Sequence, residues 1–130
     1  MRARLKGMDS WDAPDLDAYA PEDPESFAIN LNITVGEQDA PGGHVFSMTV
    51  CTPLWLARNM DLDEILPGRH YLFVRRYDID EIDRFIREYV EDEEFETWDE
   101  AASYVGRLAK WEFEDYDEAT RTWRKRGKEI

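Results

Sequence analysis

The fold is decided by the stretch Phe27-Ala28-Ile29-Asn30-Leu31-Asn32-Ile33-Thr34-Val35. Large apolar residues alternate in it with small or polar ones at a period of two, which is typical of a strand with one buried face. Residues 36–43 follow and contain the turn-forming triplet Pro41-Gly42-Gly43. The next stretch, from His44 to Cys51, alternates in the same way. Together the two stretches predict an antiparallel hairpin.

Shorter elements flank this hairpin. Residues 2–6 alternate basic and apolar side chains, which predicts a short, half-buried strand with a basic outer face. Thr52 and Pro53 are typical of an N-cap and a first helical position, so a short helix is expected from Leu54 to about Asn59. The apolar residues 71–74 predict a compact strand.

Two amphipathic helices are predicted in the second half of the chain. Asp78 with Glu81, and Thr97 with Glu100, have the spacing of a capping box. Behind each box the apolar residues recur at helical spacing and form one stripe. The first stripe comprises Ile79, Ile82, Phe85, Ile86, Tyr89 and Val90, and the second comprises Trp98, Ala101, Ala102, Val105, Leu108 and Ala109.

The order of these elements predicts an α+β fold in a single domain, an antiparallel sheet of about four strands with two main helices packed on one face. A length of 130 residues suits one domain, and 42% apolar residues suit a folded chain. Residues 9–25 are rich in acidic residues and proline and predict an ordered surface loop. We expect Trp11, Leu16 and Tyr19 to attach this loop to the body.

The charge is strongly negative, with 30 acidic and 16 basic residues and a net charge of −14. A field of this sign repels nucleic acid and anionic membranes, and it attracts basic proteins. We therefore predict no direct nucleic-acid partner and no membrane partner. The need for solubility, or adaptation to a salty host, would explain the same excess of carboxylates.

The composition also indicates the cellular compartment in which the protein is expected. A single cysteine excludes an internal disulfide, the basic start has no apolar segment of a secretory signal behind it, and no apolar run would span a membrane. These features predict a cytoplasmic protein. The sequence carries no signal for a particular oligomeric state.

No residue has the neighbours that catalysis or metal binding needs. His44 and His70 each stand alone at the start of a predicted strand. Cys51 lies at a strand-to-helix junction, where the pKa of a thiol can fall, but no histidine adjoins it. Residues 61–64 lack the glycine and distal glutamate of a calcium loop. We predict no catalytic, cofactor-binding or metal-binding residue, and therefore a protein that is not an enzyme.

The candidate binding surface is an acidic block at the junction of the two predicted helices. Its members are Glu88, Glu91, Asp92, Glu93, Glu94, Phe95, Glu96 and Asp99, with Glu100 beside them. Like charges at this density repel one another, and a basic partner would relieve the repulsion and associate fast. Phe95 and Trp98 are the candidate aromatic anchors within the block. The alternative for both is a place in the core, with Trp98 at the head of its apolar stripe.

Three motifs follow one another along the chain. They are Pro21-Glu22-Asp23-Pro24-Glu25-Ser26-Phe27, Val50-Cys51-Thr52-Pro53-Leu54-Trp55-Leu56 and Gly106-Arg107-Leu108-Ala109-Lys110-Trp111-Glu112-Phe113-Glu114-Asp115-Tyr116. Together they resemble the immunity protein 8 family, small bacterial antidotes to secreted polymorphic toxins. The resemblance implies a protein that binds and neutralises a cognate toxin domain. Residues 1–116 are then the immunity-protein-like domain, and residues 117–130 form a basic C-terminal extension.

Three functional classes remain open. The leading interpretation is a non-catalytic immunity protein with an acidic toxin-binding surface and no cofactor, and a basic nuclease toxin would suit its charge. An acidic mimic of nucleic acid would instead inhibit a DNA-binding protein, and it predicts carboxylates spaced along one extended face. A small metal-dependent enzyme would need a bound ion, which the leading interpretation does not require.

Overall fold

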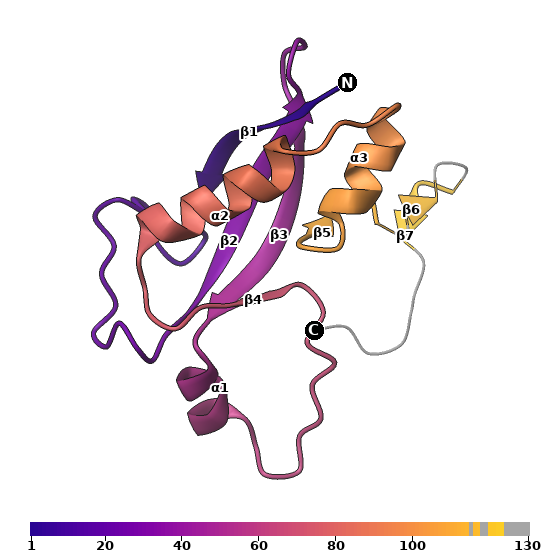
Figure 1. Cartoon of the computed structure of the whole chain (residues 1–130). Helices are drawn as coiled ribbons and strands as arrows, with labels where there is room; N and C mark the ends of the chain where they lie inside the picture. The colour runs from indigo at the N-terminus through magenta and orange to yellow at the C-terminus, as the bar shows by residue number, and fades with distance from the viewer. Residues whose placement is uncertain (115, 118–119, 124–130) are drawn as a thin grey trace.

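A mixed five-stranded sheet forms the centre of the protein, whose computed structural model describes residues 1–114, 116–117 and 120–123. The strands of this sheet are β1 (Ala3–Asp9), β2 (Ala28–Glu37), β3 (His44–Cys51), β4 (Tyr71–Phe73) and β5 (Lys110–Trp111). The helices are α1 (Pro53–Asn59), α2 (Ile79–Glu91) and α3 (Trp98–Val105). Figure 1 shows α2 and α3 on one face of the sheet, with α1 beyond the end of β3. A separate two-stranded sheet is formed by β6 (Tyr116–Asp117) and β7 (Thr122–Trp123).

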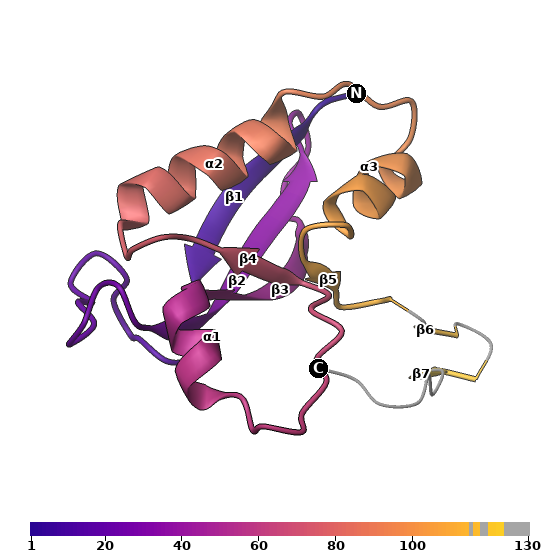
Figure 2. The same ribbon diagram turned by 60° about the horizontal axis from the view of Figure 1, so that its bottom comes forward.

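The predicted α+β class is confirmed, but the prediction of an antiparallel sheet is wrong for one strand pair. β4 runs parallel to β3, with Leu72 opposite Val50. The chain leaves β3 at its C-terminal end, passes through α1 and an extended loop, and re-enters the sheet in the same direction (Figure 2). β5 pairs antiparallel with the other half of β3, where Trp111 lies opposite Phe46. Two residues are too few to show alternation, so the sequence pattern did not predict β5.

The core lies between the sheet and the two helices on its covered face (Figure 1). β3 pairs with β2 along its whole length, with Ile33 opposite Phe46, which confirms the predicted hairpin. The strands contribute Ile29, Leu31, Ile33, Val35, Phe46, Met48 and Val50 to the buried set, and the helices contribute Ile82, Ile86, Val90, Ala101, Ala102 and Val105. Burying so much apolar surface is the main favourable term of folding.

The helix stripes differ from their predicted form at two places. α3 ends at Val105, so Leu108 and Ala109 are buried in the turn that follows the helix. Phe85 faces solvent with 49% of its surface exposed. It lies at one margin of the α2 stripe, about 60° round the helix from Ile82 and on the side away from Ile86, where the sheet no longer covers it.

The predicted N-caps are present. Oδ1 of Asp78 accepts hydrogen bonds from the backbone N–H groups of Asp80 and Glu81, and Oγ1 of Thr97 accepts one from Glu100. Oγ1 of the buried Thr52 accepts from the N–H of Trp55 at 3.2 Å, which caps α1.

The side chains of α2 close the free edge of β1. Oε2 of Glu91 accepts a hydrogen bond from the backbone N–H of Leu5 at 3.0 Å, and the Arg87 guanidinium donates to the Leu5 carbonyl at 3.4 Å. Arg2 donates to the backbone carbonyl of Glu91 at 3.1 Å. Unpaired strand edges recruit other strands, so these bonds protect the sheet from pairing with another chain.

The loop of residues 9–25, which we call the acidic loop, is attached to the body of the protein partly by other contacts than those predicted. Leu16 and Tyr19 are partly buried, and the ring of Tyr19 lies 5.2 Å from that of Tyr77. The prediction for Trp11 is wrong, because its side chain is 78% exposed. Its backbone N–H instead donates to the side chain of Asn30 at 2.9 Å. Hydrogen bonds to the sheet thus attach the first turn of the loop.

Two further predictions from the sequence, the basic C-terminal extension and the lack of a membrane-spanning segment, can be compared with the described part of the chain only. Of the predicted basic extension, residues 118–119 and 124–130 lie outside the described residues, and the remainder includes β7. No helix within the described part of the chain has the length and apolar character needed to cross a membrane.

Replacement of Ile86 by aspartate is expected to unfold the protein or nearly so. Ile86 is completely buried between α2 and the sheet, and an unpaired buried carboxylate costs several kcal/mol of a total stability of about 5–15 kcal/mol. Ile82→Asp should behave alike. The matched control is Phe85→Asp, one residue before Ile86 and exposed, which should melt close to the wild type. The measurement is the melting temperature of each variant, followed by circular dichroism. A melting temperature of Ile86→Asp close to that of the wild type would contradict the placement of α2.

Candidate functional site

The acidic block lies where α2 ends and α3 begins, at the top of Figure 1. Most of its carboxylates face solvent, and the exposed members are Glu88, Asp92, Glu93, Glu94, Glu96 and Asp99. Glu88 belongs to the last turn of α2, Asp92 is its C-cap, and Asp99 is in the first turn of α3. The connection and the helix ends that flank it therefore expose six charges within residues 88–99.

These six carboxylates have no ion-pair partner among the residues that the structure describes. Within 4.0 Å, the only member of the block that pairs with a described cation is Glu91, which lies 3.5 Å from Arg87. Glu100, beside the block, accepts a hydrogen bond from the backbone N–H of Glu96 at 3.4 Å. The exposed carboxylates of the block are thus available to the cations of a partner.

The helix dipoles affect the two halves of the block in opposite ways. Asp99 and Glu100 lie at the N-terminus of α3, where negative charge is stabilising. Glu88 and Asp92 lie at the C-terminus of α2, where the dipole is negative and no basic residue occupies the last turn. Carboxylates at that position oppose the dipole as well as one another, so stability does not explain their presence.

Glu91 has a structural role that its neighbours lack. It is half-buried, accepts the N–H of Leu5 and pairs with Arg87, as described for the β1 edge. From the sequence alone, Glu91 was grouped with the exposed carboxylates. Leu5, whose N–H it accepts, lies 86 residues away in the chain, so no local pattern connects the two.

The two aromatic residues of the block belong to the body of the protein. Phe95 is 6% exposed, and its backbone N–H donates to the Met1 carbonyl at 2.8 Å. Trp98 is half-buried and stacks on the ring of His44 with centroids 5.0 Å apart. Their alternative placement in the core is therefore the correct one, and neither offers an exposed anchor. The exposed aromatic residue nearest the block in sequence is Phe85, which the sequence analysis assigned to the core.

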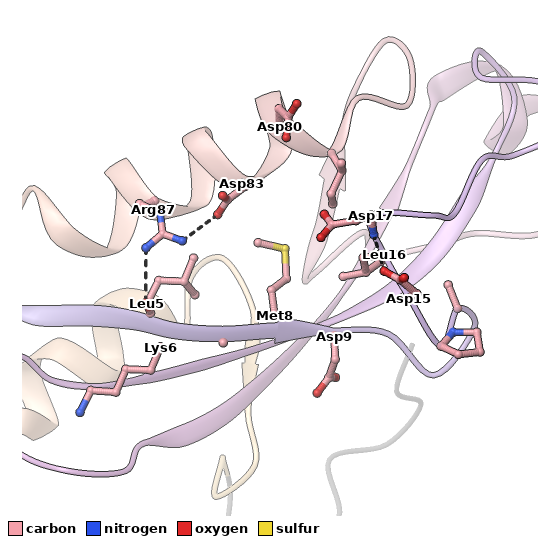
Figure 3. A pocket seen from close by; sticks show the side chains of 14 residues that line it. Leu5, Lys6, Met8, Asp9, Asp15, Leu16, Asp17, Asp80, Asp83 and Arg87 are labelled. Carbon is pink, nitrogen blue, oxygen red and sulfur yellow. Dashed lines mark hydrogen bonds and ion pairs between the residues drawn. The ribbon is translucent and has the colours of Figure 1, made fainter.

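A second acidic surface lies at the other end of α2. Figure 3 shows a cleft between β1, the acidic loop and the first turns of α2. Its carboxylates are Asp9, Asp15, Asp17, Asp80 and Asp83, and Leu5, Met8 and Leu16 supply apolar walls. Several of these groups are engaged within the protein, since Asp83 pairs with Arg87 at 3.1 Å and Asp15 accepts from the N–H of Asp17 at 3.0 Å. The cleft is therefore less open to a partner than the acidic block.

The potential catalytic groups have structural surroundings. Cys51 is fully buried, and burial raises the pKa of its thiol, the opposite of what a nucleophile needs. Burial lowers the pKa of His70, because it disfavours the charged imidazolium. The Nε2 atom of His70 lies 2.8 Å from the Gly106 carbonyl. A neutral imidazole donates to that carbonyl and holds the turn after α3 against β4. In the described part of the chain, no group of three or more His, Cys, Asp or Glu side chains could hold a metal ion.

The family model described as Immunity protein 8 matches residues 3–116, which include the sheet, all three helices and the acidic block. No curated protein and no solved structure matches the chain.

Replacing Glu91 and Glu93 separately by alanine should distinguish the structural carboxylate from a free one. Glu91→Ala leaves the Leu5 N–H without its acceptor and is expected to cost about 1–3 kcal/mol. Glu93→Ala removes an exposed side chain and should leave the unfolding free energy within about 0.5 kcal/mol of the wild type. Urea denaturation measures both, and equal losses would contradict the assignment.

Proposed function

The chain belongs to the immunity protein 8 family, and we propose that it binds and neutralises a cognate polymorphic-toxin domain without catalysing a reaction. One observation carries the choice of surface. The six exposed carboxylates at the helix junction lack ion-pair partners among the described residues, and those at the end of α2 oppose the helix dipole. A basic toxin surface would relieve both forms of repulsion.

The mechanism we propose is capture by electrostatic attraction. A net charge of −14 attracts a basic protein, and a local concentration of unpaired carboxylates orients it. Such steering raises the association rate more than the affinity and weakens as salt increases. An antidote must keep free toxin scarce, which requires a dissociation constant near or below about 1 nM, or about −12 kcal/mol. A basic nuclease fits this charge, and we place the encounter in the cytoplasm.

A nucleic-acid mimic is the second candidate, because acidic groups occur at both ends of α2. A mimic needs carboxylates in an extended row. On α2 the row is interrupted by the exposed Arg84 and Arg87, and Arg87 is bound to Asp83 and Glu91. The clustered arrangement therefore supports a protein partner at the junction better than a mimic of a phosphate backbone.

Neutralising the free carboxylates should slow association with the toxin. The variant carries the five changes Glu88→Gln, Asp92→Asn, Glu93→Gln, Glu94→Gln and Glu96→Gln, and keeps Glu91. We expect an association rate at least about tenfold lower at low salt, with a flatter salt dependence, because the field that steers the encounter is reduced. Stopped-flow binding to the cognate toxin domain at two ionic strengths measures this.

The control for this variant removes the same number of charges from other exposed positions. It carries Glu22→Gln, Glu25→Gln, Asp39→Asn, Asp61→Asn and Asp63→Asn. Equal slowing by both variants would mean that net charge alone steers the toxin. Slowing by the control only would move the interface to the loops.

Cys51→Ser should preserve neutralisation of the toxin in cells that express both proteins. The thiol is buried where β3 meets α1, so the change affects packing and is expected to lower the melting temperature moderately. A folded Cys51→Ser protein that no longer protects the cells would disprove the assignment of a purely structural role to the thiol.

A further inference from the structure

Four aromatic rings form a continuous series from the outer face of α2 to the core beneath the acidic block. Phe85 and Tyr89 have ring centroids 6.4 Å apart, and Tyr89 stacks on Tyr104 of α3 at 4.6 Å. Tyr104 lies 5.5 Å from Phe95. Exposure decreases along the series, from Phe85 in solvent through the half-buried tyrosines to the buried Phe95. We call these four residues the aromatic ladder.

The inner rings hold the outer ones in place. The hydroxyl of Tyr89 donates to the backbone carbonyl of Tyr104 at 3.2 Å, which joins α2 to α3. Phe95 is fixed in the core by its backbone bond to Met1. A partner that contacts Phe85 and Tyr89 would therefore meet a surface whose order has already been established during folding, which lowers the entropic cost of binding.

Side chains of both signs surround the outer rings, since the exposed Arg84 directly precedes Phe85 and two glutamates lie near it on the helix. On the surface of α2, Phe85 has Glu81 four residues before it and Glu88 three residues after it. Glu81 lies 3.7 Å from Arg76, whereas Glu88 pairs with no cation that the structure describes. The nearby Arg87 guanidinium is held by Asp83, Glu91 and the Leu5 carbonyl. An exposed ring beside an unpaired carboxylate is a suitable receptor for a cation.

One of the inner rings of the ladder, Tyr104, already carries a cation. The guanidinium carbon of Arg107 lies 5.7 Å from the ring centroid of Tyr104, over the ring. This contact is the geometry of a cation–π pair. It shows the kind of group that a ring of the ladder accepts, and Phe85, the outermost ring, has 49% of its surface exposed, whereas Tyr89 is half-buried.

We propose that Phe85, the outermost ring of the aromatic ladder, supported by Tyr89, anchors the toxin by receiving one of its arginine side chains, with Glu88 as the charge partner. This inference rests on the proposed function and names the anchor of the same surface. An arginine fits because its planar guanidinium stacks on a ring and pairs with a carboxylate at the same time. Binding would exclude water from both contacts and strengthen them.

The ladder and the acidic block then have separate kinetic roles. Exposed carboxylates act on the encounter, because their field extends into solvent. The ladder acts only after contact, because dispersion and cation–π forces act at short range. The other carboxylates should therefore set the association rate, and Phe85 with its charge partner Glu88 should set the dissociation rate.

The test compares Phe85→Ala with Phe73→Ala. Both phenylalanines are 49% exposed, and Phe73 lies on β4, away from the acidic block. Neither change alters the charge, and thermal melts confirm that both variants fold. For Phe85→Ala we expect dissociation from the cognate toxin domain to be about tenfold faster with an unchanged association rate. Phe73→Ala should match the wild type. A wild-type dissociation rate for Phe85→Ala would overturn the inference.

A third variant identifies the group that the ladder receives. Phe85→Leu keeps a large apolar side chain but removes the aromatic face. If the toxin contributes an arginine, Phe85→Leu should dissociate nearly as fast as Phe85→Ala. Wild-type behaviour of Phe85→Leu would mean that an apolar toxin residue lies there, and it would overturn the assignment of arginine.

A peptide probe keeps this inference distinct from the proposed function. Titration with hexa-arginine should shift the ring NMR signals of Phe85 and Tyr89 and leave those of Phe73 unchanged. Shifts confined to the acidic residues would overturn the cation site. If the wild type fails to bind or neutralise the toxin, the proposed function fails, and the inference about the toxin fails with it. If the wild type neutralises and Phe85→Ala dissociates normally, only the inference fails.

Discussion

The structure depends on β3, whose backbone pairs with three strands. β2 covers one edge of β3 along its whole length, while β4 pairs with the last part of the other edge and β5 with the first part. Phe46, Val50 and Cys51 of β3 are completely buried. Because β4 and β5 must reach the same edge from different parts of the chain, the segment between them has to leave the sheet and return. That segment comprises α2, the junction and α3.

The position of the acidic block follows from this constraint. α2 begins after β4 and runs along β1, and α3 must end where β5 can join β3 (Figure 1). The connection between the helices therefore lies at the far end of the covered face, where it contacts Met1 and Arg2, buries Phe95 and exposes its carboxylates to solvent. The sheet below it is closed by Glu91 and Arg87. A rigid support thus carries a short, highly charged connection, which is a suitable arrangement for presenting charge to a partner.

The carboxylates in this region divide into two kinds. Glu91 is bound to the backbone of β1 and contributes to the fold, whereas Glu88 and Asp92 oppose the dipole of their own helix and touch no described cation. Marginally stable proteins retain unfavourable charges mainly where function requires them. Membership of the immunity protein 8 family implies a cognate toxin as the partner of this protein.

The sequence by itself determined the local features. Alternation predicted β2 and β3, residue type predicted the caps at Thr52, Asp78 and Thr97, and charge density located the acidic block. Each of these features depends on residues within about four positions of one another, so it can be recognised without the fold. Only the tertiary structure decided that β4 runs parallel to β3 and that Phe95 is buried while Phe85 is exposed. It also decided that Glu91 bonds to Leu5. These outcomes depend on segments that are distant in sequence, because a margin of a helix is buried or exposed according to what the rest of the chain packs against it.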